Sequence, residues 1–571
     1  MITKPDLLFI KDVFEQNEEK GLGLSSLKWS KGYDGQHISF SDIYEIFNKD
    51  LIANFSPNVE VFDPDHFPKD LGLDTLVNEF LSPKYSGGFI YHALSRAPTD
   101  CSTIQFRWEI LDELLQNRKK VKYLNEVCEQ LYNITWLIEE RKKVRNKAME
   151  FHFDENDLLR VDIPILQQYV ECVKAFAEVL EGSASKGLAS LYDYSKKLMK
   201  NDQFNFLSEQ LNNFLNNHYV ELGVTLDAQQ SLRKVKFLDT ELYKLKRPVL
   251  TKIRAKSHQL SSWNLILNCW PLGYTRLVAM AFDDIVEDSL KQIKTTTQLI
   301  GDIEFYTSAI KFYDILKENN IPVTRPKLIG KENRTHYITN MRNPMVSFIK
   351  VCGKGIRVRE IVPNSMNVDP QHNVYIITGA NGGGKTCYVK SIGLVHMLAQ
   401  SGYHIPVEVA EMSIVDNIYT HFALPDETTQ PGGRWKNELK RVYPIWDKVT
   451  PYSLCLIDDL GSGTNFEEAE KPILTIIYGF YKTNATIFMN SHLHKIADVI
   501  EKGEFPGASN LQDKIIEKED SINYTYKIIP GKAGKSYAAE VASAMGINKK
   551  EIDSLFKNRV EKGEIPKDLL R

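Results

Sequence analysis

The chain contains 571 residues, with 71 Lys and Arg against 74 Asp and Glu, so its formal net charge is −3. A hydrophobic content of 43% with 25% charged residues is ordinary for a globular protein, which excludes a disordered chain, a collagen-like fibre and a disulfide-stapled miniprotein. The near-neutral balance argues against a uniformly basic nucleic-acid coat but is compatible with a local basic surface. At about 100–200 residues per domain, the length predicts three or four domains.

The seven cysteines are widely spaced and form no CxxC pair, so neither a zinc ribbon nor a thioredoxin-like site is indicated. Reduced thiols fit a cytosolic compartment. The N-terminus has an apolar run of only four residues, too short for a signal-peptide core. The most apolar later stretch, 263–282, is interrupted by polar residues, a proline and a glycine, so it is not expected to span a membrane. We therefore expect a soluble, cytoplasmic protein.

Residues 1–65 carry no interpretable motif, and 1–69 is treated as an N-terminal region of unknown fold. From about Leu71 to Asn320 the apolar pattern is mostly helical, which predicts an α-helical core or lever domain over 70–325. Pro164 is expected in the first turn of one helix, at its start, and Gly182 at its C-terminal stop. Its apolar stripe, predicted to pack into a core, recurs at three- and four-residue steps: Ile165, Leu166, Tyr169, Val170, Val173, Phe176, Ala177 and Leu180.

A basic run lies inside this helical stretch. Between Arg233 and Lys256 there are nine Lys or Arg against two acids, a local surplus of seven positive charges. Such a run is typical of a solvated helix face, and it also suits contacts with DNA phosphates. The candidate DNA-contacting residues are Arg233, Lys234, Lys236, Lys244, Lys246 and Arg247.

The composition changes between Lys317 and Arg334, where asparagine, proline and glycine cluster. Beyond this boundary, short apolar runs with strand character alternate with helical stretches, which predicts an α/β domain with a largely parallel sheet over 326–548. The expected strands are Val374–Thr378, Leu454–Ile457, Thr486–Met489 and Tyr524–Ile529. Residues 549–571 have room for a C-terminal helix and a tail.

A phosphate-binding loop is the strongest signal in the chain. It follows the strand VYIIT, opens a helix and satisfies GxxxxGK[ST]. Glycines let the backbone N–H groups close around phosphates, and the helix N-terminus adds a partial positive charge. Lys385 is expected to reach the β- and γ-phosphates of ATP, and the Thr386 hydroxyl to bind Mg²⁺. The predicted ATP-binding residues are Gly379, Ala380, Asn381, Gly382, Gly383, Gly384, Lys385 and Thr386.

An acidic pair follows a downstream strand, as expected for the partner of such a loop. Asp458 and Asp459 come directly after Leu454–Ile457. Asp458 is predicted to hold the Mg²⁺ shell with Thr386, and Asp459 to orient the attacking water. His492 lies just past another predicted strand, at the edge of the sheet where ligands bind. It is either an ordinary structural histidine or a residue that senses the γ-phosphate or polarises the water.

These motifs, in this order, resemble those of the MutS family of mismatch-repair ATPases. The loop GANGGGKT is similar to the family's GPNMGGKS, and Asp458–Thr464, DDLGSGT, is similar to DEIGRGT. Weaker matches are Met341–Pro344 to GRHP, Gly402–Val407 to GxxVPA, Met489–His492 to the ATH motif, and Leu94–Asn117 to the start of the family's core domain. The resemblance covers about residues 70–545.

The resemblance implies a multidomain protein with a mostly α-helical lever region followed by an α/β P-loop ATPase domain of the ABC type. It also implies a homodimer in which two ATP molecules lie between ATPase domains, with double-stranded DNA, including mismatched or branched DNA, as partner. Because the core begins near residue 70, we expect a short core-plus-ATPase form without the mismatch-recognition and connector domains.

Three departures from the family pattern bear on activity. Asp459 replaces the family's catalytic Glu and is one methylene shorter; because a misplacement of about 1 Å costs on the order of 10²-fold, slow hydrolysis is expected. Gly433 stands where the family has a serine that touches the partner's γ-phosphate, with Arg434 as a possible substitute charge. Asn343 replaces a histidine near the expected adenine edge.

The leading hypothesis is an ATPase that switches a dimeric clamp on DNA, in mismatch repair or recombination. One alternative is a regulatory ATPase that acts on a ribosome or a protein complex. Another is a nucleotide-binding scaffold with little turnover, which Asp459 and Gly433 together favour.

Overall fold

The structure is a computed structural model that describes residues 2–8, 47–49, 51–52, 67–150, 155–216, 219–220, 222–226, 232–237, 253–254, 272–346, 361–422, 433–461, 466–518, 521–533, 547 and 549–566. The chain divides into two compact units. The helical unit contains Met1–Ser56, Leu81–His92 and Ser102–Lys311, and the sheet unit contains Pro57–Phe80, Ala93–Cys101 and Phe312–Arg571. Each unit is therefore assembled from segments that are separated in the sequence.

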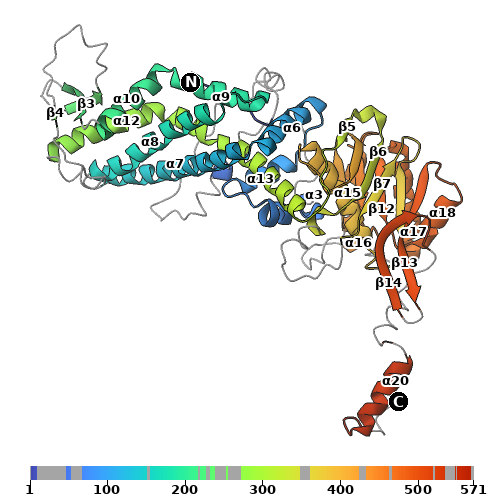
Figure 1. Ribbon diagram of the computed structural model, residues 1–571. Coiled ribbons are helices and arrows are strands. Elements are labelled where there is room, and N and C mark those ends of the chain that lie inside the picture. The colour runs from blue at the N-terminus through green and yellow to red at the C-terminus, as the bar shows by residue number, and fades with distance from the viewer. Residues whose placement is uncertain are drawn as a thin grey trace. The chain divides into compact units, whose positions relative to one another are not determined.

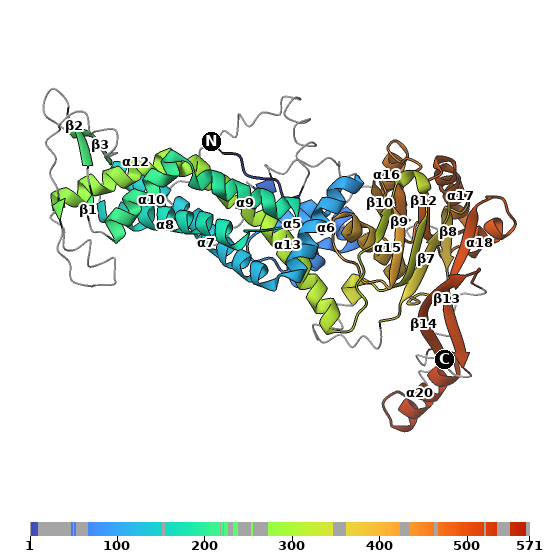
Figure 2. The ribbon, with the colours of Figure 1, turned by 45° about the horizontal axis from the view of Figure 1, so that its top comes forward.

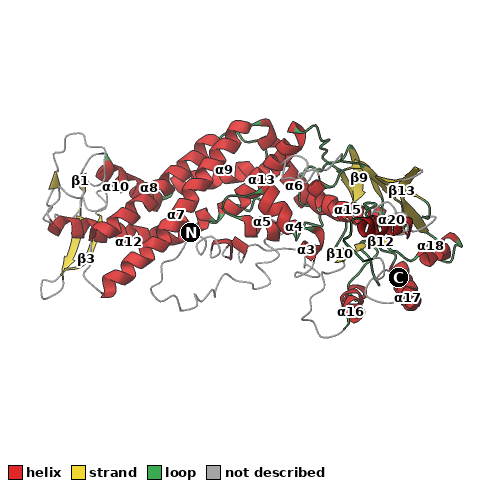
Figure 3. Ribbon diagram, turned by 90° about the horizontal axis from the view of Figure 1, so that it is seen from below, coloured by secondary structure: helices red, strands yellow, loops and turns green. Residues whose placement is uncertain are grey.

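Long helices make up most of the helical unit (Figures 1 and 3). In the centre, α8 (Glu155–Val179) contacts α7 (Arg118–Glu150), α9 (Lys186–Met199), α10 (Asp202–Leu215) and α12 (Leu272–Thr297). Most of α5 (Gly87–Leu94), α6 (Cys101–Gln116) and α13 (Leu299–Glu318) also belongs to this unit. Two short antiparallel pairs complete its described part: β1 (Tyr219–Val220) with β4 (Ile253–Arg254), and β2 (Leu222–Leu226) with β3 (Leu232–Phe237).

The apolar stripe of α8 packs into the core as predicted. All eight predicted stripe residues are buried, from Ile165 to Leu180. The predicted start of this helix at Pro164 is wrong, because α8 begins at Glu155 and Pro164 lies inside it. A proline inside a helix removes one backbone hydrogen bond, and the contacts of the buried stripe compensate for that loss.

The first residues of the chain are part of the helical unit. Leu7 and Leu8 are buried, and Lys4 Nζ lies 2.8 Å from Asp302 Oδ2 on α13. The Leu8 carbonyl accepts a hydrogen bond of 2.8 Å from Arg107 Nε, and the Leu7 carbonyl accepts one from the Tyr306 hydroxyl. This segment therefore packs against helices some 100 and 300 residues further along the chain.

The sheet unit is built around a six-stranded sheet in the order β10, β11, β12, β8, β13, β14 (Figure 2). The first five strands are parallel, and β14 runs antiparallel to β13. All four predicted strands are present, and the prediction of a largely parallel sheet is confirmed. The strands are β8 (Val374–Thr378), β10 (Ile418–His421), β11 (Leu454–Ile457), β12 (Thr486–Asn490), β13 (Ala508–Lys518) and β14 (Ser521–Pro530).

A second sheet of four strands lies in the same unit, in the order β5, β9, β6, β7. Its strands are β5 (Lys327–Ile329), β6 (His336–Met341), β7 (Asn364–Val368) and β9 (Val409–Ser413). The remaining short elements of this unit are α3 (Phe67–Leu71), α4 (Leu73–Thr75), η1 (Leu76–Leu81, shared with the helical unit) and η2 (Lys331–Asn333).

Helices cover both faces of the six-stranded sheet. Because alternate residues of a strand point to opposite faces, each strand contributes apolar side chains to the packing on both sides. On one face, Ile376, Ile457 and Met489 pack into one core with side chains of α16 (Arg434–Trp446), α17 (Phe466–Thr483) and α18 (His494–Glu501). On the other face, Tyr388 of α15 (Lys385–Gln400) packs edge-on against Phe488. A further helix, α20 (Lys549–Glu561), follows near the C-terminus. Among the described residues, no helix is both long and apolar enough to cross a membrane.

Candidate functional site

The predicted phosphate-binding loop connects β8 to α15. Gly379, Gly382 and Gly384 have φ angles of 139°, 82° and 94°, and Gly384 is the N-cap of α15. These positive φ values are readily adopted only by glycine. The structure therefore places Gly379 to Gly384 in the turn between a buried strand and a helix, with Lys385 and Thr386 as the first residues of that helix, which is the arrangement that binds anions.

Lys385 is folded back onto the loop that it belongs to. Its Nζ donates hydrogen bonds of 3.0 Å to the Gly379 carbonyl and 2.6 Å to the Ala380 carbonyl. Burial lowers the pKa of Lys385, while the nearby carboxylates of Asp513, Asp458 and Asp459 act in the opposite direction. The lysine is thus held at the loop by carbonyl groups, which a phosphate group is able to replace.

The two residues predicted to hold Mg²⁺ lie in contact. Thr386 Oγ1 donates a hydrogen bond of 3.0 Å to Asp458 Oδ1. Asn490 Nδ2, at the end of β12, donates to the same oxygen. Burial raises the pKa of Asp458, and these hydrogen bonds from Asn490 and Thr386 oppose the rise. A carboxylate and a hydroxyl at a phosphate-binding loop are oxygen ligands that suit Mg²⁺, so the residues fit this ion.

The two predicted catalytic residues also lie together. His492 Nε2 is 3.4 Å from Asp459 Oδ1, and about a third of each side chain is exposed. Asp459 has a φ of 52°, in the left-handed region that is uncommon for residues other than glycine. Because Asp459 directly follows Asp458, this turn presents two carboxylates and an imidazole at the carboxyl edge of β11 and β12.

Sequence reasoning missed two residues beside the loop. Asp513 of β13 accepts a hydrogen bond of 3.1 Å from the Ala380 N–H. Tyr526 of β14 is about half exposed, has a φ of 56°, and its Cδ1 lies 3.4 Å from where a β-carbon on Gly384 would be. Asp513 lies on β13, which pairs with β8, and Tyr526 lies on β14, which pairs with β13, so no local motif marks either residue. Their position in strands of the six-stranded sheet was the available signal.

Gly433, which stands where the family has the serine that touches the partner's γ-phosphate, and Arg434 lie at the start of α16. Gly433 is the N-cap of α16, and no heavy atom of the described residues lies within 4 Å of a β-carbon built on it. Arg434 Nε is 3.4 Å from Glu438 Oε1. Glu438 Oε2 in turn accepts a hydrogen bond of 2.9 Å from the Gly461 N–H, which ties α16 to the turn that follows Asp459.

An ion pair also links α16 to α3. Arg441 Nη2 lies 2.7 Å from Asp70 Oδ2, and the same oxygen accepts a hydrogen bond of 2.9 Å from Thr420 Oγ1 at β10. Leu71 packs against Gly393 of α15, since a β-carbon built on that glycine would lie 2.8 Å from Leu71 Cδ2. A segment from the first hundred residues is therefore part of the sheet unit's packing.

Asn343, which stands in place of the family's histidine, is buried against α15. Its Nδ2 donates hydrogen bonds of 3.0 Å to the Cys387 carbonyl and 2.9 Å to Ser391 Oγ. Its Oδ1 accepts from the Met345 N–H at 2.8 Å. The amide therefore fixes the chain ahead of the loop to the first turns of α15.

The basic run predicted to be a solvated helix face is not helical in its described part. Arg233, Lys234 and Lys236 lie in β3. Val235 and Phe237 are buried, and the Phe237 ring packs edge-on against Phe282 of α12. The helical expectation was wrong here because the strand periodicity of two, with Val235 and Phe237 inward, was overlooked. Lys236 Nζ is 3.2 Å from Asp284 Oδ2. Lys244, Lys246 and Arg247 lie outside the described residues.

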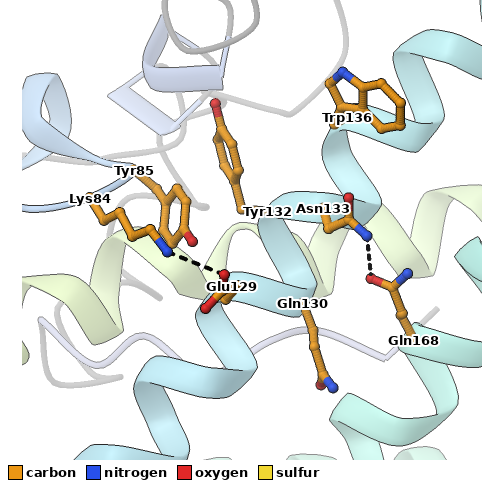
Figure 4. Close-up of a pocket in the computed structure, with 8 residues that line it drawn as sticks. All are labelled: Lys84, Tyr85, Glu129, Gln130, Tyr132, Asn133, Trp136 and Gln168. Atoms are coloured by element: carbon orange, nitrogen blue, oxygen red, sulfur yellow. Dashed lines mark hydrogen bonds and ion pairs between the residues drawn. The ribbon is translucent and has the colours of Figure 1, made fainter. Parts of the chain in front are cut away.

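A cavity of about 570 Å³ lies in the helical unit (Figure 4). The rings of Tyr85 and Tyr132 are stacked with centroids 4.3 Å apart, and Asn133 Nδ2 donates a hydrogen bond of 2.9 Å to Gln168 Oε1. Its remaining lining residues are Lys84, Glu129, Gln130 and Trp136. Sequence reasoning did not identify this aromatic and amide-lined cavity.

Comparisons with known proteins point to one family. A family model for MutS domain V matches residues 375–559, which include the loop, the acidic pair and most of α20. Proteins named DNA mismatch repair protein MutS are similar over part of their length. The protein from Halothermothrix orenii is 30% identical over 270 residues, which are 46% of this chain and 28% of the relative.

Other relatives with the same name give similar values. The protein from Carboxydothermus hydrogenoformans is 29% identical over 221 residues, 38% of this chain and 25% of the relative. The protein from Leptospira interrogans is 29% identical over 273 residues, 47% of this chain and 30% of the relative. The chain thus spans less than a third of the length of these curated relatives.

Proposed function

Because the chain belongs to the MutS family of DNA mismatch repair proteins, we propose that it is an ATP-driven, dimeric switch that binds DNA. The observation that carries this proposal is the convergence of Lys385, Thr386, Asp458, Asp459 and His492 at the carboxyl ends of three adjacent strands. A lysine, a hydroxyl, paired carboxylates and an imidazole at one edge are the groups that nucleoside-triphosphate hydrolysis needs.

In the proposed nucleotide site, each group has a distinct task. The loop N–H groups and the N-terminus of α15 bind the phosphates, and Lys385 moves from the loop carbonyls to the β- and γ-phosphates. Thr386 and Asp458 hold Mg²⁺, which neutralises phosphate charge. Tyr526 lies beside Gly384 with its ring half exposed, a position from which an aromatic side chain can stack on a base.

Hydrolysis is assigned to Asp459 and His492. The carboxylate orients a water molecule, and the imidazole, 3.4 Å from it, polarises that water or senses the γ-phosphate. Asp459 reaches less far than a glutamate would, so we propose slow turnover.

A homodimer is the proposed assembly. Among the described residues, no heavy atom lies within 4 Å of a β-carbon built on Gly433, and the N-terminus of α16 is the segment that we propose to contact a nucleotide bound by a second copy. On α20, Ile552, Leu555 and Phe556 are exposed to 40%, 55% and 36% and follow the three- and four-residue spacing of one helix face. An apolar face of this kind suits burial against the same helix of a second copy.

Double-stranded DNA, including mismatched or branched forms, is the proposed partner, and the cytoplasm is the proposed location. The proposed contacts are the basic residues of β3, Arg233, Lys234 and Lys236, together with Lys244, Lys246 and Arg247. Because Lys236 Nζ also lies 3.2 Å from Asp284 Oδ2, part of its charge is offset at that position.

A nucleotide-binding scaffold with little turnover is the second candidate function. Two observations favour it: the short acid at Asp459, and the absence of any side chain at Gly433. A regulatory ATPase acting on a ribosome or protein complex differs from the leading proposal in its partner rather than in its nucleotide chemistry.

The test is fluorescence anisotropy of the full chain on homoduplex, mismatched, branched and single-stranded DNA, with and without Mg·ATP and at two salt concentrations. An ATP-dependent change in affinity for any of these supports the DNA switch, since a switch requires different affinities in the two nucleotide states. No binding near physiological salt, with ATP affinity intact, refutes it and favours the protein- or ribosome-directed alternative.

A further inference from the structure

We propose that Asp513 is a positioning residue of the phosphate-binding loop: its carboxylate holds the loop from the neighbouring strand and competes with the nucleotide phosphates for Lys385. This inference rests on the proposed binding of ATP. Asp513 lies on β13, outside the loop motif. Its Oδ2 accepts a hydrogen bond from the N–H of Ala380, which is 133 residues away in the sequence.

Strand pairing delivers the carboxylate to the loop. β13 runs parallel to β8, and the last pair in their register is Gln512 with Thr378. Asp513 is therefore level with Gly379, the first residue of the loop. On its other side, the register of β13 with β14 shifts between Asp513, which pairs with Ile528, and Ile515, which pairs with Tyr524. The pairing next to Asp513 is therefore irregular, with the additional residues on β14.

Two glycines of the loop make room for this carboxylate. A β-carbon on Gly379 would lie 1.7 Å from Asp513 Oδ1, and one on Gly383 would lie 1.9 Å from Oδ2. Gly379 also needs a positive φ, but no positive φ is found at Gly383. The motif GxxxxGK[ST] leaves position 383 open to any residue, and in this chain the neighbour that demands a glycine there is Asp513.

The charge of Asp513 acts on the residue that binds phosphate. Asp513 is almost fully buried, so its field is weakly screened by water. Burial raises the pKa of Asp513, and both Lys385 and the Ala380 N–H oppose that rise. Among the acids that raise the pKa of Lys385, Asp513 has the largest effect. A phosphate group that enters the loop therefore competes with the Asp513 carboxylate for the positive charge of Lys385.

Charge and hydrogen bonding can be separated with two variants. Asp513→Asn removes the charge and retains an oxygen that can accept from the Ala380 N–H. We expect it to lower the dissociation constant of Mg·ATP about tenfold, as a Coulombic term at an effective dielectric constant of about 20 allows. In steady-state assays KM should fall while kcat stays unchanged. Asp513→Ala leaves the N–H without this acceptor and should bind ATP more weakly than Asp513→Asn by about fivefold.

The binding measurement uses the full chain and a fluorescent ATP analogue, with Asp447→Asn as the matched control. Asp447 is an exposed aspartate at the end of α16, so loss of its charge should leave the dissociation constant unchanged. An Asp513→Asn variant with the wild-type dissociation constant overturns the inference, provided that the wild type binds ATP.

A second measurement needs no nucleotide. Gly383→Ala should lower the melting temperature strongly in the wild type, because its β-carbon meets the carboxylate. In an Asp513→Ala background, the nearest remaining side-chain atom to a β-carbon at position 383 is the β-carbon of residue 513, at 3.0 Å. Gly383→Ala should therefore lower the melting temperature much less in that background. Gly433→Ala, where nothing lies within 4 Å among the described residues, should have equal effects in both backgrounds.

Additive effects of Gly383→Ala and Asp513→Ala would overturn the inference, since residues in contact give a coupling and independent residues do not. The two measurements also separate the inference from the proposed function. If the wild type bound no ATP, the proposed function would fail, and the melting-temperature cycle would still decide whether Asp513 holds the loop.

Discussion

The imidazoles of His336 and His396 share a hydrogen bond in the interior of the sheet unit. His396 Nε2 lies 3.1 Å from His336 Nδ1, and His396 Nδ1 lies 2.8 Å from the Ile392 carbonyl. Because a carbonyl only accepts, His396 carries its proton on Nδ1, and His336 then donates to His396 Nε2. The pair joins β6 to α15, the helix that begins at the predicted phosphate-binding loop. This pattern of hydrogen bonds requires that both imidazoles are neutral.

Acid should therefore destabilise the sheet unit through this pair. Burial lowers the pKa of His396 to about 4, and burial together with His396 lowers the pKa of His336 further below its ordinary value. The unfolded chain thus binds more protons than the folded one below about pH 6.5, so the contribution is present above that pH and is lost as the pH falls toward 4. For His396 alone the loss is on the order of 3 kcal/mol.

The check is thermal unfolding at pH 7.5 and 5.5 for the wild type, His396→Leu and His372→Asn. The wild type and His372→Asn, which changes an exposed histidine, should lose stability on acidification. His396→Leu should lose less, and an equal loss in all three proteins would contradict the prediction.

Replacement of the loop lysine should weaken nucleotide binding strongly. Lys385→Ala deletes the only side-chain cation that hydrogen bonds to the loop in the described part of the chain. Charge-assisted hydrogen bonds contribute about 1.5–3 kcal/mol, so ATP affinity should fall about 10- to 100-fold or more. The measurement is the dissociation constant of a fluorescent ATP analogue, with the exposed Lys471→Ala as control. Retained micromolar affinity in Lys385→Ala would be incompatible with a phosphate-binding loop.

A longer acid at position 459 should speed hydrolysis. If the short reach of Asp459 limits the reaction, Asp459→Glu should raise kcat by about 10- to 100-fold, the sensitivity expected for a displacement of about 1 Å. Asp459→Asn should lower kcat, and both variants should keep the ATP affinity of the wild type. Turnover per chain is measured by phosphate release. A slower Asp459→Glu variant would mean that the turn with φ 52° and His492 is fitted to aspartate.

Charge reversal on β3 should weaken DNA binding and flatten its salt dependence. In the triple variant Arg233→Glu, Lys234→Glu and Lys236→Glu, each lost phosphate contact should reduce the slope of log K against log salt by about 0.9. The control reverses three exposed lysines on helices of the same unit or their ends: Lys119, Lys186 and Lys200. Equal affinities for the two triple variants would exclude β3 from the DNA site.

A charge on the apolar face of α20 should disrupt the proposed dimer. Leu555→Asp places a carboxylate in the middle of the stripe formed with Ile552 and Phe556. Lys557→Asp is the matched control, because position 557 lies about 200° around the helix from Leu555. Light scattering should give a monomer mass for Leu555→Asp alone. A dimer mass for both variants would show that this face is not the interface.

Local sequence patterns predicted what local geometry decides. The loop, the acidic pair and His492 follow buried apolar strands directly, and parallel strands bring their carboxyl ends to one edge, so the meeting of Thr386 with Asp458 was foreseeable. The apolar periodicity of α8 could also be predicted from the sequence. The start of the helix could not, because tertiary packing tolerates Pro164 inside it.

Contacts made across long sequence separations could not be predicted in this way. Lys4 and Asp302 are 298 residues apart, and Asp513 meets the loop only because of the β13–β8 register. The hairpin that contains Lys236 was mistaken for helix because its flanking sequence is helical and its strands are short.

The ion pair of Asp70 with Arg441 has a practical consequence for dissecting the protein. A fragment that starts after residue 320 would hold every proposed ATP-contacting group yet lack Asp70 and Leu71, leaving a buried guanidinium without its counter-ion and a hollow at Gly393. Truncation at an apparent domain boundary would thus produce a damaged protein, and the failure of such a fragment to bind or hydrolyse ATP would not test the motifs that it retains. A fragment meant to reproduce the sheet unit must therefore also contain the segment around residues 67–80.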